Sequence, residues 1–201
     1  MTIALPSAPA RAPRRQVLVA TALVSSAGVM LMAGMLAMWL KFRAAAPTRE
    51  SSDGLKIIKD WMPASIKIPE VAANLMLFTV VGICLMAQWA VYSAKRRDSQ
   101  HRTLALVVTF VMGIAAINSQ LAMWSQMDIA LVDGVYNTMF YAITGTMVVL
   151  LASGLAFTAV AFFRSVGGRD DDQQVISAHA LYWYFLTAAF VAMWFVVYVQ
   201  K

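Results

Sequence analysis

The side chains able to do acid–base, metal or redox chemistry are few in this chain and lie far apart. The sequence contains two histidines, His101 and His179, and one cysteine, Cys84. Ligation of haem or copper by histidine needs several His side chains within one bundle of helices. His101 lies in an Arg-rich stretch, and we place His179 in the first turn of the last predicted helix. The pattern therefore predicts no catalytic residue, no cofactor site and no metal ligand in this chain.

The elements that carry these residues follow from the distribution of charge. Only 26 of the 201 residues are Asp, Glu, Lys or Arg, about half the share usual in soluble domains. Five stretches of 24 to 30 residues without such a residue hold 132 residues together. A helix crosses a membrane with about 20 residues, and the longest remaining connection has only 30 residues. These numbers exclude a soluble enzyme or a nucleic-acid-binding domain.

We therefore predict an all-α fold, an integral membrane bundle of five transmembrane helices. The bundle would form a single transmembrane domain over residues 1–201, with spans at about 17–40, 71–94, 103–126, 136–163 and 178–199. Nine Lys and Arg residues fall on the side of the N-terminus and seven on the other side. Because Lys and Arg are enriched in cytoplasmic connections, the N-terminus is predicted to be cytoplasmic.

Small and weakly polar residues within the spans indicate helix packing. Four of them in the first span follow spacings of four, seven and four, which places them on one narrow face. They are Ala22, Ser26, Ala33 and Ala37. We expect this face to be a contact surface, either within the bundle or toward a partner. In the third span, the amides of Asn118 and Gln120 are costly in lipid and should point inward or at a partner helix.

The long connection after the first span contains a candidate amphipathic segment. Its apolar residues suit a short helix lying along the membrane surface, with Trp61 as an anchor at the membrane–water interface. The residues concerned are Leu55, Ile57, Ile58, Trp61 and Met62.

Several short sequence motifs occur in a fixed order along the chain. They are Ala33-Gly34-Met35-Leu36-Ala37-Met38-Trp39, Phe140-Tyr141 followed by Thr144-Gly145, and Tyr182-Trp183-Tyr184-Phe185. Four single positions fit the same pattern, namely Trp61, Pro63, Asn74 and Gln120. In order and spacing they resemble the subunit III family of haem-copper cytochrome c oxidases, most closely its short, five-helix actinobacterial form. The resemblance covers all five spans, and that family also has a cytoplasmic N-terminus.

The chain departs from this family wherever the family has an ionisable side chain inside the membrane. The family's Glu, Glu, His, His, His and Asp fall here at Gly28, Met123, Met147, Leu150, Tyr184 and Thr187. Because a buried carboxylate carries a large desolvation cost, a divergent subunit used as a scaffold can lose it readily. We therefore expect packing and lipid binding to be retained, without any role that depends on these groups.

The resemblance implies a function in aerobic respiratory electron transport. The chain would be a non-catalytic subunit III of a haem-copper terminal oxidase, a multi-pass protein of the bacterial plasma membrane that packs against subunit I, with subunit II in the same complex. Haem and copper are expected in the partner subunits and not in this chain. The partners would be these subunits and membrane lipids, not nucleic acid.

The residues expected to carry this role form two sets. The first is the packing face Ala22, Ser26, Ala33 and Ala37. The second would bind lipid, with Asn118, Gln120, Trp183 and Tyr184 lining a cleft and Arg96, Arg97 or His101 at the phosphate. Two other interpretations remain open, a subunit-III-like accessory protein of a nitric oxide reductase and a free-standing membrane protein that binds lipid or another ligand.

Overall fold

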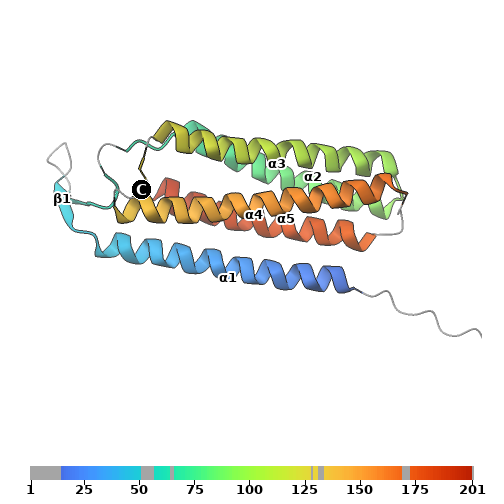
Figure 1. Ribbon diagram of the computed structural model, residues 1–201, viewed down its shortest axis with the longest axis horizontal. Coiled ribbons are helices and arrows are strands. Elements are labelled where there is room, and N and C mark those ends of the chain that lie inside the picture. The colour runs from blue at the N-terminus through green and yellow to red at the C-terminus, as the bar shows by residue number, and fades with distance from the viewer. Residues whose placement is uncertain are drawn as a thin grey trace, which may run out of the picture.

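The structure, a computed structural model, describes residues 15–50, 57–63, 66–127, 129–130, 134–168 and 173–200 (Figure 1). Within these residues, five helices are long and apolar enough to cross a membrane. They are α1 (Gln16–Ala45), α2 (Glu70–Lys95), α3 (Ser99–Met127), α4 (Val135–Val166) and α5 (Gln173–Met193), which continues as the π-helical segment η1 (Trp194–Val199). The prediction of a five-helix membrane bundle is confirmed, and each predicted span lies within one of these helices.

Helix α5 lies at the centre of the bundle. It packs against α1, α2 and α4, while the outer helices pack on one another in the order α1, α4, α3, α2. Among the described residues α1 and α2 share no extensive contact, so the outer helices leave one side of α5 open. All five helices run along the long axis of the molecule, with α1 at one edge and α3 at the other (Figure 1).

The end of the bundle at which α2 passes into α3 is here called the turn end. Arg97 adopts a left-handed backbone conformation with φ 58°, and the N–H of Asp98 donates to the carbonyl of Ser93 at 3.0 Å. This is the arrangement that commonly closes a helix, although glycine usually takes the left-handed position. Asp98 then caps α3, because its Oδ1 accepts the N–H of His101 at 3.1 Å. That hydrogen bond is the main reason why the pKa of Asp98 lies below its usual value.

The opposite end, the hairpin end, carries a β hairpin where an amphipathic helix was predicted. Strand β1 (Thr48–Glu50) pairs antiparallel with β2 (Ile57–Lys59), and Leu55 lies outside the described residues. Lys59 Nζ donates to the carbonyls of Ala44 and Ala46 at 3.1 Å each, which satisfies groups that the end of α1 leaves without a partner. The helix prediction was wrong because pairing with β1 gives the backbone of this segment an alternative set of hydrogen bonds.

Trp61 follows β2 and joins the core. Its ring lies 5.1 Å from that of Trp39 and 5.7 Å from that of Tyr136, and the side chain is buried. The expectation that Trp61 anchors the chain at the membrane–water interface is therefore corrected. The indole instead packs the long connection against α1 and α4, because edge-to-face contact with two other aromatic rings is favourable.

Candidate functional site

His179 is fully buried between α4 and α5. Its Nε2 accepts a hydrogen bond from Trp183 Nε1 at 3.0 Å and lies 2.9 Å from Thr158 Oγ1. Because α5 begins at Gln173, earlier than the predicted span, His179 lies on its second turn and not its first. The sequence-based placement at the helix end is corrected, and the ring connects two helices.

The tautomer of His179 follows from this network. Trp183 Nε1 can only donate, so Nε2 of His179 acts as an acceptor and the neutral ring carries its proton on Nδ1. Nδ1 has no hydrogen-bond partner among the described residues. The ring thus receives a hydrogen bond from Trp183 and lies beside the hydroxyl of Thr158, which donates to the carbonyl of Gly154. Among the described residues it has no carboxylate or second histidine with which to exchange a proton.

A second buried polar contact joins α3 and α4 at the turn end. Arg102, which the sequence analysis placed in a connection, is the fourth residue of α3 and only 2% exposed. Its Nε donates to Ser165 Oγ at 2.7 Å, and Thr103 Oγ1 lies 3.4 Å from the same hydroxyl. A buried guanidinium is tolerated only when it is hydrogen-bonded, so this contact stabilises the packing of α3 on α4.

Polar groups at the hairpin end also connect α5 to its neighbours. Tyr198 Oη donates to Gln120 Oε1 of α3 at 3.1 Å, and Trp194 Nε1 donates to Asn74 Oδ1 of α2 at 3.2 Å. Both aromatic residues belong to η1. The wider turn of a π-helix changes the direction of side chains relative to an α-helix. In η1, Trp194 therefore contacts α2 while Tyr198 contacts α3.

The positions where the resembled family has ionisable groups are mostly filled by apolar packing. Met123 and Met147 are fully buried. At Gly28, an added Cβ would lie 2.4 Å from the tip of the Phe185 ring, so this ring occupies the space that a larger side chain would need. Across the described residues, no group of three or more His, Cys, Asp or Glu is placed to hold a metal ion.

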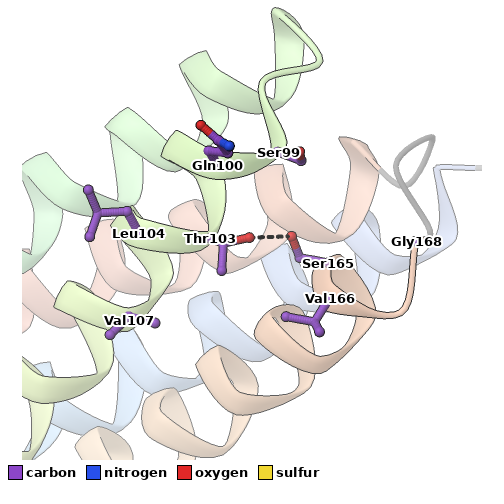
Figure 2. A pocket seen from close by; sticks show the side chains of 8 residues that line it. All are labelled: Ser99, Gln100, Thr103, Leu104, Val107, Ser165, Val166 and Gly168. Atoms are coloured by element: carbon purple, nitrogen blue, oxygen red, sulfur yellow. Dashed lines mark hydrogen bonds between the residues drawn. The ribbon is translucent and has the colours of Figure 1, made fainter.

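An open pocket of about 670 Å³ lies at the turn end between α3 and the end of α4. It is lined by Ser99, Gln100, Thr103, Leu104, Val107, Ser165, Val166 and Gly168. Figure 2 shows the hydroxyls of Thr103 and Ser165 turned toward each other, with α3 on one side and the end of α4 on the other. The polar groups of the pocket therefore lie at the turn end, where α3 begins and α4 ends.

A second, apolar hollow lies next to this pocket, farther along the same two helices. This hollow has a volume of about 230 Å³ and is lined by Leu106, Val107, Phe110, Ala159, Phe162 and Phe163. Val107 lines both cavities, so they adjoin at this side chain, and together they are called here the α3/α4 groove. Its polar mouth and apolar floor have the distribution of chemistry that an amphiphile such as a phospholipid requires.

The seven residues predicted to bind lipid do not come together in one cleft. Gln120 and Trp183 are fully buried and make the interior hydrogen bonds described above. Asn118 is exposed on α3, whereas Tyr184 is half-buried on α5. The basic members, Arg96, Arg97 and His101, are exposed at the turn end, far along the bundle from Asn118. The sequence placed Asn118, Gln120, Trp183 and Tyr184 on helices correctly but could not show which side each one faces. Arg96 and Arg97 lie in the predicted connection, whereas His101 belongs to the start of α3.

The predicted packing face of α1 points away from the bundle. Of its four residues, Ser26, Ala33 and Ala37 are exposed and Ala22 is half-buried. The buried residues of α1 lie on a neighbouring face, at Thr21, Ser25, Gly28, Met32, Leu36 and Trp39. These four small residues thus do not pack within this chain. Of the two predicted roles, contact within the bundle is excluded, and contact with a partner stays a prediction.

With the geometry described, the comparisons with known proteins identify the family. The sequence model of the family "Cytochrome c oxidase subunit III" matches residues 17–201. The chain belongs to the cytochrome c oxidase subunit III family. The resemblance inferred from short words of sequence is confirmed.

Relatives in this family are distant and longer. Cytochrome c oxidase subunit 3 of Bos taurus is 25% identical over 146 residues, covering 69% of this chain and 54% of that protein. A probable cytochrome c oxidase subunit 3 of Rickettsia conorii is 23% identical over 159 residues, covering 73% and 55%. The chain therefore spans about half the length of the curated relatives that it matches.

Sequence reasoning missed three interior polar residues of this subunit III chain, namely Arg102, Thr158 and His179. One signal was present for His179, since it precedes Trp183 by four residues and must share a helix face with it. Arg102 is the last cation before a charge-free stretch, which is compatible with either a connection or a first helical turn. Thr158 carried no distinguishing signal, because its role depends on the α5 side chains opposite.

Proposed function

We propose that the protein is a non-catalytic subunit III of a haem-copper terminal oxidase in a bacterial plasma membrane, where it takes part in aerobic respiratory electron transport. The family match over residues 17–201 is the observation that carries this proposal. The chain would pack against the catalytic subunit I, with subunit II in the same complex. Haem and copper would be held by those partner subunits, and this chain would contribute packing surface and bound lipid.

The hydrogen bonds inside the chain support this scaffold role. His179, Arg102 and Gln120 are each engaged with a residue of another helix, so the polar interior connects the helices of the bundle. The turn end would face the cytoplasm, because the Lys and Arg count of nine against seven favours that side. The hairpin would then lie on the outer side.

We place bound lipid in the α3/α4 groove and not at the residues first predicted. The hydroxyls of Thr103 and Ser165 lie at the mouth of the groove, and the buried Arg102 donates a hydrogen bond to Ser165 from the interior of the bundle. Below the mouth, the groove is apolar. A phospholipid headgroup at the mouth would lie at interfacial depth, with one acyl chain along the floor.

Purification of the tagged full chain in mild detergent from cells that make it natively tests the assembly. A haem absorbance spectrum, together with a subunit I polypeptide identified by mass spectrometry, is the expected result. A nitric-oxide-reductase-type catalytic subunit would instead indicate the accessory role in that complex. A colourless chain that purifies alone with lipid would contradict the oxidase proposal and favour a free-standing lipid-binding protein.

Filling the groove tests the lipid site. Val107→Trp should displace one tightly retained phospholipid, because the added ring occupies the point where the two cavities meet. Val149→Trp is the matched control, since Val149 is exposed on α4 and lines neither cavity. Lipids retained after detergent exchange are counted by native mass spectrometry, and equal retention in the two variants would argue against the groove.

A further inference from the structure

Helix α5 is uncovered along one narrow stripe. The residues of this α5 stripe are half-buried or exposed and follow spacings of three, four, three and four, which places them on one helix face. They are Leu181, Tyr184, Ala188 and Val191 of α5, and Phe195 at the start of η1. Since α1, α2 and α4 pack against the other sides of α5, the stripe lies in the opening between α1 and α2.

Polar groups line the α2 edge of this opening. The hydroxyl of Tyr184 donates to Oε1 of Gln88, across from α5 to α2. One turn farther along α5, Thr187 Oγ1 donates to the carbonyl of Val80 at 3.3 Å. Gln88 is exposed, whereas Tyr184 and Thr187 are half-buried, so the amide of Gln88 is the group that the opening presents outward.

The depth of Gln88 makes this amide unusual. It precedes Lys95 by seven residues, which corresponds to about 10 Å along α2 from the charged end of the helix. Oε1 already accepts from Tyr184, but the two amide hydrogens have no partner among the described residues. A donor left without an acceptor in hydrocarbon is strongly unfavourable. The phosphate and ester oxygens of lipids lie at the membrane surface, so the missing acceptor is expected from protein.

We propose that the opening between α1 and α2 seats one transmembrane helix of another subunit, and that this helix presents a side-chain hydrogen-bond acceptor to the amide of Gln88. The inference rests on the proposed function, because it requires a membrane-embedded partner. The apolar stripe supplies van der Waals contact, and Ala188 at its centre allows a helix to approach closely.

A comparable amide elsewhere provides the control. Asn118 is exposed on α3, which lies on the opposite side of α2 from the opening in the packing order of the outer helices. Leu121, one turn farther along α3, is also exposed. If the partner recognised any exposed amide, it would contact α3 near Asn118 as readily as the α5 stripe.

Photocrosslinking in the assembled complex tests the proposal. p-Benzoylphenylalanine is placed at Ala188 or at Leu121 of the tagged full chain, and native membranes are irradiated before purification. We expect Ala188 to crosslink to a transmembrane segment of one other subunit, identified by mass spectrometry, and Leu121 to give at most one-third of that yield. Adding Gln88→Leu should lower the Ala188 yield about threefold or more, whereas adding Asn118→Leu should leave it unchanged.

Each other outcome overturns the inference. A crosslink from Ala188 to a second copy of this chain or to lipid alone would do so, as would a stronger crosslink from Leu121, or a yield that Gln88→Leu does not change. Co-purification of the unmodified tagged chain with a haem-containing subunit is measured in parallel. If that co-purification occurs and Ala188 gives no crosslink, the docking inference fails while the proposed function stands. If the haem-containing subunit does not co-purify, the proposed function itself is contradicted, and the docking inference falls with it.

Discussion

Helices α1 and α5 are similar in composition but occupy opposite kinds of position in the bundle. In its apolar 18-residue stretch, α1 has a mean hydropathy of 2.0 and α5 with η1 has 1.8, yet 22% of the residues in the α1 stretch are buried against 50% in the α5 stretch. Helix α1 meets the rest of the chain mainly through α5, whereas α5 packs against three helices. The slightly less apolar helix is therefore the more buried one.

This difference reflects the solvent in which the bundle folds. Lipid tails are as apolar as a protein core, so Leu23 and Met30 of α1 can remain exposed at little cost. Polar side chains cannot, because hydrocarbon offers them no hydrogen-bond partner. His179 and Trp183 of α5 bond to each other and to Thr158 of α4, and Tyr198 of η1 bonds to Gln120 of α3. Between α1 and α5, polar content rather than hydropathy distinguishes the central helix from the peripheral one.

The largest expected effect separates the two helices directly. Phe190 of α5 is fully buried and Met30 of α1 is 76% exposed. Phe190→Ala should lower the free energy of unfolding by about 3–5 kcal/mol through a cavity, and Met30→Ala by less than about 0.5 kcal/mol. Titration with sodium dodecyl sulfate in mixed micelles measures both values. Equal losses would remove the distinction between a central and a peripheral helix.

The contact between the two helices is tested at Gly28. Gly28→Ala brings a Cβ to 2.4 Å from the Phe185 ring and should cost about 1–3 kcal/mol of unfolding free energy through overpacking. Gly34 on the same helix has no described atom within 4 Å of such a Cβ, so Gly34→Ala should be neutral or stabilise α1 by up to about 1 kcal/mol. Thermal denaturation in detergent ranks the two variants. If they behave alike, α1 does not pack on α5 at this point.

The hydrogen bonds of α5 are tested with two threonines of α4. Thr158 and Thr146 both donate to the carbonyl four residues earlier, at 2.8 Å each, but only Thr158 also contacts His179 and Trp183. Thr158→Val should therefore cost about 0.5–1.5 kcal/mol of unfolding free energy, and Thr146→Val close to nothing. A double-mutant cycle with Trp183→Phe should show coupling for Thr158 alone; coupling for Thr146 would contradict the assigned network.

The smallest effect lies outside both helices, at the cap of α3. The N–H of His101 lowers the pKa of Asp98 in the folded state, so the folded protein favours the ionised carboxylate more than the unfolded chain does. The resulting stability is present above the ordinary Asp pKa, near pH 4, and is lost as the pH falls through the lower folded-state pKa. Asp98→Asn should abolish this small decline in denaturation temperature below about pH 4. An unchanged decline would assign it to another group.

Much of the architecture was predictable because the membrane imposes simple rules on sequence. Charge-free stretches longer than about 20 residues locate the helices, and all five were found. The connection after α1 was mispredicted, since Ile57 and Lys59 are compatible with either a helix or a strand, and only pairing with Thr48 and Glu50 decides for the strand. The site residues were less predictable still. Gln120 and Asn118 are two positions apart, but one is buried and the other exposed.

The sequence alone determined the number of helices, the membrane environment and, through short words in order, membership of the subunit III family. These properties depend on local composition and on linear spacing, which the chain displays without being folded. Only the tertiary structure decided that α5 lies at the centre, that Phe185 fills the space beside Gly28, and that Gln88 faces an open side of the bundle. The physical reason is that lipid and protein interior are equally apolar, so which face of a membrane helix is buried depends on its neighbours.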